Sequence, residues 1–145
     1  MTEVRFYDEV DDGLLKFAVI IARTDGKWIF CKHRERDTFE VPGGHREKGE
    51  DILDTAKREL YEETGAVDFD IRPVCVYSVT APDNFDGAET FGMLFFADVR
   101  SFEEELHSEI ERIVISDELA DKWTYPEIQP RLIEEAERRG FIPHG

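Results

Sequence analysis

Apolar residues near the start of the chain form two β-rich runs with a polar turn between them. Residues 14–22 and 28–32 are rich in β-branched and aromatic side chains, which favour strands. Asp25 and Gly26 lie between these runs, and an Asp-Gly pair in this setting is a strong signal for a β-hairpin. The pattern therefore predicts a hairpin, preceded by an acidic stretch, residues 1–12, that we expect to form a strand and a turn.

Residues 51–64 have the spacing of an amphipathic helix. Its apolar residues share one stripe at helical spacing: Ile52, Leu53, Ala56 and Leu60. Such a stripe is typical of a helix that packs one face on a core. Glu50 and Asp51 suit the positive N-terminal end of this helix, and Gly65 stands where a left-handed C-terminal cap belongs.

The remaining pattern completes one mixed architecture. β-rich segments cover residues 38–41, 67–79, 91–99 and 113–115, and a helical pattern covers residues 127–139. The first of these segments is expected to stop at the Pro-Gly-Gly of residues 42–44, and residues 81–87 form a turn-rich loop that could act as a lid. Because no linker or repeat interrupts the chain, the order of elements predicts a single α/β (α+β) domain over residues 1–145, a sandwich with a mixed sheet.

Charge narrows the set of partners. The chain has 145 residues, of which 34 are acidic and 18 basic, so its formal net charge is −16. A surface this negative repels phosphate backbones and anionic membranes, which argues against a nucleic-acid polymer or a membrane as partner. A phosphate ligand would need divalent cations or a local basic pocket.

Apolar run length and cysteine use indicate the compartment. No apolar run approaches the ~20 residues of a membrane span, and the acidic N-terminus does not resemble a signal peptide. Cys31 and Cys75 each lie alone inside apolar stretches, which predicts buried thiols, with a disulfide as the open alternative. A soluble cytoplasmic protein is expected.

Three acids at the end of the predicted helix break local rules. Glu59, Glu62 and Glu63 have i, i+3, i+4 spacing, so their like charges crowd one face and oppose the helix dipole. A divalent ion resolves this conflict, and carboxylate oxygens suit Mg²⁺ or Mn²⁺. The alternative for a bare acidic cluster is an ordinary solvated face, which we weigh about equally.

Neighbouring residues strengthen the metal-site interpretation. Arg58 can hold a carboxylate by bidentate hydrogen bonds, and Glu50 near the helix start is a suitable partner. Gly43 and Gly44 allow close approach of the backbone, so that a carbonyl oxygen can become a further metal ligand.

The full spacing resembles the signature of the Nudix hydrolase family. That signature is G-x5-E-x7-R-E-U-x-E-E-x-G-U, where U is a bulky apolar residue, and it matches residues 44–66 from Gly44 through Gly65. The last position is Ala66, which is smaller than usual and is followed by Val67. Residues 39–44 are also similar to the aromatic-x-x-Pro-Gly-Gly stretch that precedes the signature in this family.

The resemblance implies an α/β/α sandwich that hydrolyses a nucleoside diphosphate linked to another group, using Mg²⁺ or Mn²⁺. It also assigns roles. Glu59, Glu62 and Glu63 become metal ligands together with the Gly43 carbonyl, and Glu59 also orients or deprotonates the attacking water. Arg58 and Glu50 then organise the loop and the helix. An additional acid from a later loop is expected to be Glu109, ahead of Glu111 and Glu105, with plain surface charge as an equal alternative.

One basic cluster stands out in the acidic chain. Lys32, Arg34 and Arg36 precede the Pro-Gly-Gly turn and are interpreted as a phosphate clamp, with Arg34 or Arg36 favoured by reach. The alternative is an exposed loop that balances nearby acids, and His33 receives no catalytic role.

Residues that could read a base are less distinctive. Phe85, Trp123 and Tyr125 are aromatics near turns that could stack on a base, although core or rim positions are commoner. Gln129 and Asn84 are types that can read a base edge, but the sequence singles out neither.

The leading hypothesis is an Mg²⁺-dependent pyrophosphohydrolase that converts nucleoside triphosphates, including oxidised ones such as 8-oxo-dGTP, to monophosphate and pyrophosphate. The enzyme alternatives are a nucleotide-sugar or ADP-ribose pyrophosphatase and an RNA-end pyrophosphohydrolase, the last disfavoured by the charge of −16. A different class is a non-catalytic nucleotide sensor, which typically loses a glutamate that this chain keeps. The partner is expected to be a small nucleotide, and the protein a monomer or homodimer.

Overall fold

The structure, a computed structural model of the chain, is built on one seven-stranded sheet with the order β1-β5-β6-β2-β3-β7, in which β4 pairs with β2. It describes residues 2–33, 35–81, 88–103 and 110–142, the side chains of 110–112 excepted. The elements are β1 (Glu3–Tyr7), the 3₁₀ turn η1 (Asp12–Leu14), β2 (Leu15–Thr24), β3 (Lys27–His33), β4 (Gly43–His45), α1 (Ile52–Thr64), β5 (Ala66–Thr80), β6 (Thr90–Phe102), β7 (Ile110–Ser116) and α2 (Gln129–Arg138).

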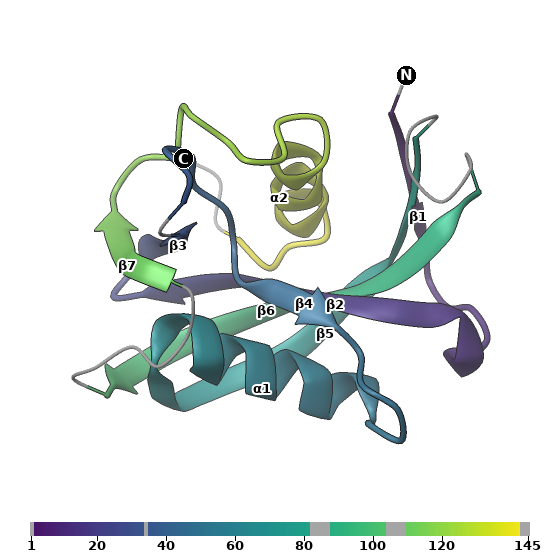
Figure 1. Cartoon of the computed structure of the whole chain (residues 1–145), viewed down its shortest axis with the longest axis horizontal. Helices are drawn as coiled ribbons and strands as arrows, with labels where there is room; N and C mark the ends of the chain where they lie inside the picture. Colours follow the sequence, from purple (N-terminus) through teal and green to yellow (C-terminus); the bar gives the residue numbers. More distant parts are fainter. Residues whose placement is uncertain (1, 34, 82–87, 104–109, 143–145) are drawn as a thin grey trace.

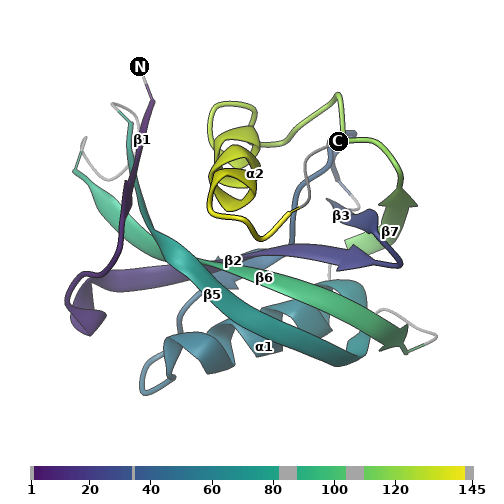
Figure 2. The ribbon, with the colours of Figure 1, turned by 180° about the vertical axis from the view of Figure 1, so that it is seen from behind.

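The two helices cover opposite faces of the sheet. Figure 1 shows α2 on one side of the central strands and α1 on the other, and Figure 2 shows the same layers from behind. The strands β2 and β6 run parallel, whereas the other strand pairs are antiparallel. The predicted α/β/α sandwich with a mixed sheet is therefore confirmed.

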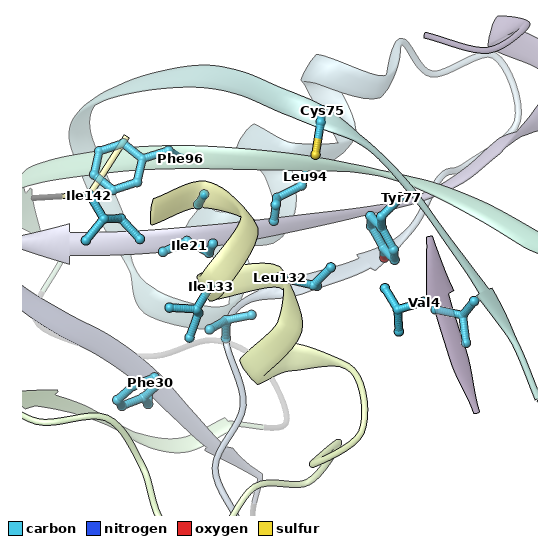
Figure 3. Close-up of a cluster of buried hydrophobic side chains, with 13 residues drawn as sticks. Val4, Ile21, Phe30, Cys75, Tyr77, Leu94, Phe96, Leu132, Ile133 and Ile142 are labelled. Atoms are coloured by element: carbon cyan, nitrogen blue, oxygen red, sulfur yellow. The ribbon is translucent and has the colours of Figure 1, made fainter. Parts of the chain in front are cut away.

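Alternation along the strands gives the sheet two apolar faces. On the central strand β2, Ile20 packs in the cluster under α1, which includes Leu60, whereas Ile21 packs in the cluster under α2, which includes Leu132. Successive side chains of a strand point to opposite faces, so a strand covered on both sides is apolar throughout. Figure 3 shows the α2-side cluster, which includes Tyr77 and Leu132. Among the described residues, no helix has the length and apolar character needed to cross a membrane.

The predicted hairpin is confirmed. β2 and β3 pair antiparallel through Arg23 and Trp28. Asp25 and Gly26 in the turn both have positive φ, 50° and 75°. Two successive positive φ values define the tight turn whose twist matches that of the strands it joins, and Asp-Gly tolerates them.

The prediction of a strand at residues 38–41 is wrong. Phe39 and Glu40 form only isolated bridges, to Trp123 and Cys31, and the regular strand β4 comes afterwards, at the two glycines. A side chain at Gly43 would bring its Cβ within 2.7 Å of the Ala18 carbonyl oxygen. The Pro-Gly-Gly sequence therefore permits close strand pairing with β2 instead of ending a strand.

The two cysteines are buried free thiols, as predicted. Cys31 and Cys75 are 0% and 3% exposed. The Sγ of Cys31 lies 3.7 Å from the carbonyl oxygen of Glu63, so β3 passes directly against the last turn of α1.

Candidate functional site

The helix α1 positions the acidic cluster by its two ends. Asp51 caps the N-terminus by accepting a hydrogen bond from the Leu53 N–H at 2.9 Å. Gly65 ends the helix in the left-handed region at φ 77°, and its N–H donates to the Tyr61 carbonyl. These caps place the apolar stripe on the sheet, and the carboxylates then follow from helical spacing.

The three predicted carboxylates differ in exposure. The side chains of Glu59 and Glu63 are only 12% and 13% exposed, whereas that of Glu62 is 45% exposed. Glu59 and Glu63 therefore face the seam between α1 and the sheet, and Glu62 faces solvent beside them.

The two glycines of β4 lie directly against these carboxylates. A Cβ at Gly44 would lie 1.9 Å from Oε2 of Glu59, so any side chain there would displace the carboxylate. The Gly43 N–H donates to Oε1 of Glu63 at 2.7 Å. The backbone of β4 and the helix acids thus meet directly, as the sequence analysis expected, although the contact shown here uses the Gly43 N–H.

Arg58 is the hub that organises the cluster. It donates to both oxygens of Glu50, from Nε at 2.7 Å and from Nη2 at 3.0 Å, and to Glu59 from Nη1 at 2.9 Å. It also donates to the carbonyl oxygen of His45 at 3.0 Å, and Nη1 lies 3.4 Å from Oε1 of Glu62. The guanidinium therefore ties the helix to β4 and to Glu50, which precedes the helix.

Glu50 is satisfied within the protein. The Arg58 hydrogen bond, followed by that from the Thr55 hydroxyl, lowers the pKa of Glu50 to about 2. A carboxylate with several donors stays ionised, so the charge of Glu50 is neutralised within the protein.

Glu59 and Glu63 are not satisfied in this way. Burial raises the pKa of Glu59 to about 7, against the opposing effect of Arg58. Burial raises the pKa of Glu63 to about 8, and the charges of Glu59, Glu40 and Glu62 add to the effect, whereas the Gly43 hydrogen bond opposes it. Two buried acids with raised pKa values in one seam are a strong candidate for a functional site.

The donor set fits a divalent cation. In the described parts of the chain, no group of three acidic, histidine or cysteine side chains is already placed to hold a metal ion. Arg58 holds Glu59 and Glu62, and Gly43 holds Glu63. These are hard oxygen donors whose excess negative charge the protein does not neutralise, which is the chemistry that Mg²⁺ or Mn²⁺ prefers.

A cleft of about 600 Å³ opens beside the acids, between β4 and the start of α2. Its lining includes Gly43 and Gly44 from β4, Glu63 from α1, and Tyr125, Ile128 and Gln129 at the start of α2. It also includes apolar side chains of the sheet and of α2, namely Phe17, Val19, Tyr77, Val79 and Leu132. This size is typical of a small-molecule site, and the lining combines acidic and apolar side chains.

A polar cluster that the sequence analysis missed lines the same cleft. Nε2 of His33 lies 3.5 Å from Oε2 of Glu40 and 3.9 Å from Oε2 of Glu63. Nη1 of Arg36 donates to Oε1 of Glu40 at 3.2 Å. The bridge between Glu40 and Cys31 sets this arrangement, and a bridge between distant segments leaves no local signal.

The members of the predicted basic cluster differ in their relation to the cleft. Arg36 lines the cleft. Lys32 is not among the described lining residues, and its Nζ donates to the His33 carbonyl at 3.4 Å. Arg34 lies outside the described residues.

The structure also distinguishes among the predicted aromatic and acidic residues. Tyr125 lines the cleft, whereas Trp123 packs edge-on against Phe30, with ring centroids 5.4 Å apart, as a core residue. The other candidates fall outside what the structure describes: Phe85, Asn84, Glu105, Glu109 and the side chain of Glu111.

Comparisons with known proteins identify the family of the chain. Residues 14–143 match the model of the NUDIX domain. The chain is 29% identical over 103 residues to "Putative 8-oxo-dGTP diphosphatase YtkD" of Bacillus subtilis (strain 168), covering 71% of this chain and 62% of that protein. It is 31% identical over 77 residues to an RNA pyrophosphohydrolase of Psychrobacter sp. (strain PRwf-1), covering 53% of this chain and 42% of that protein. The chain thus spans less than two thirds of both relatives.

A solved structure has a similar fold. A crystal structure of a mutant of the Bacillus subtilis pyrophosphohydrolase BsRppH superimposes with a TM-score of 0.79 at 24% identity, over 98% of this chain and 93% of that one. The glutamate cluster, its arginine hub and the family match over residues 14–143 lead to one conclusion: the chain belongs to the NUDIX family.

Proposed function

We propose that this protein is a divalent-metal-dependent hydrolase that cleaves a diphosphate linkage in a nucleotide. The observation that carries the proposal is the buried pair Glu59 and Glu63, which lacks sufficient neutralisation at the seam beside the cleft. A substrate whose phosphates bring a cation would supply the missing positive charge beside these two acids, whereas the apolar side chains of the cleft suit a base.

Each residue of the cluster has a role in this proposal. Glu59, Glu62 and Glu63, with the Gly43 carbonyl, would hold Mg²⁺ or Mn²⁺. When bound, such an ion activates water and neutralises phosphate charge. Arg58 fixes the orientation of Glu59 through the 2.9 Å hydrogen bond.

The proposed reaction accounts for both the proton of the attacking water and the leaving group. The water oxygen attacks phosphorus, the anhydride P–O bond breaks, and the displaced phosphate leaves as an anion. Glu59 accepts the proton that the water releases, which is the role that the family resemblance implies for it. Arg36, on the wall of the cleft, binds a phosphate oxygen of the substrate.

The substrate we favour is a nucleoside triphosphate, intact or oxidised, cut to monophosphate and pyrophosphate. The relative named as an 8-oxo-dGTP diphosphatase supports this choice. The relative named as an RNA pyrophosphohydrolase supports a second candidate, the triphosphate end of an RNA, against which the net charge of −16 weighs. The cytoplasmic location and the monomer or homodimer state stay predictions.

A product analysis tests the proposal. The protein is incubated with Mg²⁺ and 8-oxo-dGTP, the common triphosphates, ADP-ribose, a UDP-sugar or a 5′-triphosphorylated RNA, in water enriched in ¹⁸O. Pyrophosphate and monophosphate from the free triphosphates are expected, and the labelled product identifies the phosphorus attacked. Faster turnover of the RNA would favour the second candidate, and no turnover of any substrate would contradict the proposal.

A matched pair of variants ties turnover to the cluster. Glu63→Gln keeps the acceptor for the Gly43 N–H but removes the charge. Glu134→Gln makes the same change on the exposed face of α2. Loss of activity in the first variant alone is expected, whereas equal activity in both would place the chemistry elsewhere.

A further inference from the structure

Gln129 is held so that only its donor end is available to the cleft. It is the first residue of α2, 6% exposed, and it lines the cleft. Its Oε1 accepts the N–H of Val41 at 2.9 Å. Because an amide has its acceptor and donors at opposite ends, this bond fixes the orientation of the side chain and leaves the NH₂ group without an acceptor among the described residues.

The cleft that Gln129 lines also carries apolar side chains. Val41, Ile128 and Leu132 are among its lining residues. An NH₂ group that lines a cleft can donate to a ligand that supplies an acceptor, so a ligand with an apolar surface and an uncharged acceptor suits this site. A planar base with an oxo group meets both requirements, since its faces are apolar and its edge accepts a hydrogen bond.

A second polar group marks the same part of the cleft. Tyr77 is 4% exposed and lines the cleft, and its hydroxyl has no hydrogen-bond partner within the described ranges. The ring lies across Gly92 on the neighbouring strand, where a Cβ would come within 2.7 Å of the hydroxyl oxygen. Because Tyr77 lines the cleft, its hydroxyl is a second polar group that a ligand bound there can contact.

The distance between the contacts of Gln129 and of Glu63 is limited by the backbone. Val41 contacts Gln129, and Gly43 contacts Glu63. Val41 and Gly43 are separated only by Pro42, where the backbone bends, so the two positions lie at most about 7 Å apart along the chain. One short segment therefore limits the spacing between Glu63 and the amide, as a ligand with phosphates at one end and a base at the other requires.

We propose that Gln129 determines base specificity, by donating from its NH₂ group to an oxo group of the base, so that the cleft selects keto bases over amino bases. The proposal rests on the proposed function in taking the ligand to be a nucleotide. It predicts that hypoxanthine, guanine, uracil and thymine nucleotides are preferred over adenine and cytosine nucleotides.

Two substrate pairs test the selection in the unaltered protein. ITP differs from ATP, and UTP from CTP, by an oxo group in place of an amino group. The ratio of kcat/KM is expected to favour the oxo member of each pair by about tenfold or more, the scale expected for an unmatched donor. Ratios near one, or in favour of the amino member, would overturn the proposal.

A single substitution should reverse the preference. Gln129→Glu keeps the acceptor for the Val41 N–H and turns an acceptor, instead of a donor, toward the base. The oxo-to-amino ratio is expected to fall at least tenfold, and a ratio does not depend on the overall activity of the variant. Arg131→Gln, which makes the same charge change at an exposed position of α2, should leave the ratio unchanged. An unchanged ratio in Gln129→Glu would overturn the assignment.

Binding separates this proposal from the proposed function. If no nucleotide is hydrolysed, the proposed function fails, and calorimetry with IMP and AMP then decides the base preference without any turnover. Tighter binding of IMP supports the role of Gln129, whereas equal binding or no binding of the two monophosphates overturns it.

Discussion

Glu63 on α1 and Glu135 on α2 are both largely buried, yet their charges meet opposite surroundings. Glu135 accepts from Nε of Arg138 at 2.9 Å and from Nε of Arg139 at 2.6 Å, and Arg138 leads the causes that lower its pKa. Glu63 accepts only the N–H of Gly43 among its described donors, and burial raises its pKa to about 8.

The difference separates a structural acid from a functional one. The side chains of Glu135 and Glu63 are 8% and 13% exposed, so burial alone does not distinguish them. What distinguishes them is that the protein supplies the cations for Glu135, whereas other acids surround Glu63. A buried charge that the protein does not neutralise indicates that a ligand supplies the partner.

Exchanging each acid for its amide should produce opposite defects. Glu63→Gln is expected to lower kcat at least ~10²-fold, because a group that stabilises developing charge is lost, while its stability in EDTA stays the same or rises. Glu135→Gln should keep kcat but lose about 1–2 kcal/mol of unfolding free energy, since two arginines lose a charged acceptor. Steady-state kinetics and thermal melts check both, and a large stability loss in Glu63→Gln would contradict the distinction.

We expect bound metal to stabilise the protein through the acids of α1 and not through Glu135 of α2. Ions that bind only the native state increase the free energy of unfolding by mass action, by about 2.7 kcal/mol at a concentration of 100 Kd, and so raise the melting temperature. Thermal melts in EDTA and in Mg²⁺ or Mn²⁺ should therefore differ for the wild type and for Glu135→Gln. Glu63→Gln should show a much smaller rise, and superimposable wild-type curves would mean that the acids are merely solvated.

The two kinds of acid should also give stability opposite pH dependences. Without metal, Glu59 and Glu63 have pKa values of about 7 and 8, raised from 4.5. The folded state therefore keeps protons that the unfolded chain releases, and their stabilising contribution is lost as the pH rises from about 4.5 to 8. Glu50 and Glu135 have lowered pKa values, so their contribution is present above 4.5 and is lost as the pH falls below it.

Denaturant melts across pH, with and without Mg²⁺, measure this difference. Added metal should reduce the loss between pH 4.5 and 8, because it binds the ionised carboxylates and releases their protons. A metal-free unfolding free energy that rises steadily from pH 5 to 8 would contradict the assignment of Glu59 and Glu63 as unneutralised acids.

The features predicted from sequence are those that local rules determine. The caps at Asp51 and Gly65 and the shared face of the three helix glutamates follow from bonding between residues a few positions apart. The positive φ values at Asp25 and Gly26 follow likewise from the turn that this pair favours.

The features that sequence reasoning missed depend on distant contacts. β4 exists because β2 lies beside the two glycines, and Glu40 reaches the cleft because it bridges to β3. Tyr77 reads as an ordinary strand residue, and Gln129 becomes distinctive only through the Val41 N–H. From sequence, Gln129 is recognised as a residue type that can read a base edge. No spacing rule links residues 41 and 129, however, so the hydrogen bond that orients its side chain was not predictable.

A variant of Arg36 tests whether a cation that the protein neutralises only in part binds substrate phosphate. It is held by Glu40 at 3.2 Å but lines the cleft, so it is partly neutralised within the protein. Arg36→Ala is expected to raise KM by an amount equivalent to about 1–3 kcal/mol with kcat little changed, because a phosphate contact shared by ground and transition states is lost. The effect should weaken as salt screens the charge.

An exposed arginine on α2 provides the control for Arg36. Arg131→Ala removes the same charge without touching the described cleft lining, so its KM should stay at the wild-type value. If Arg36→Ala also keeps the wild-type KM at low and high salt, Arg36 is not the phosphate clamp.

The smallest expected effect concerns Tyr77, a neutral group that resembles Glu63 in lacking a sufficient partner. Tyr77→Phe removes only a hydroxyl whose pKa burial raises. Because no described residue bonds to it, the melting temperature should stay the same or rise, whereas KM should increase several-fold if the ligand supplies the partner. Tyr61→Phe is the matched control, since the Tyr61 hydroxyl donates to Glu103 at 2.8 Å on the exposed side of α1, and its loss should leave KM unchanged. A fall in melting temperature at unchanged KM for Tyr77→Phe would show that the hydroxyl is bonded within the protein and serves the fold alone.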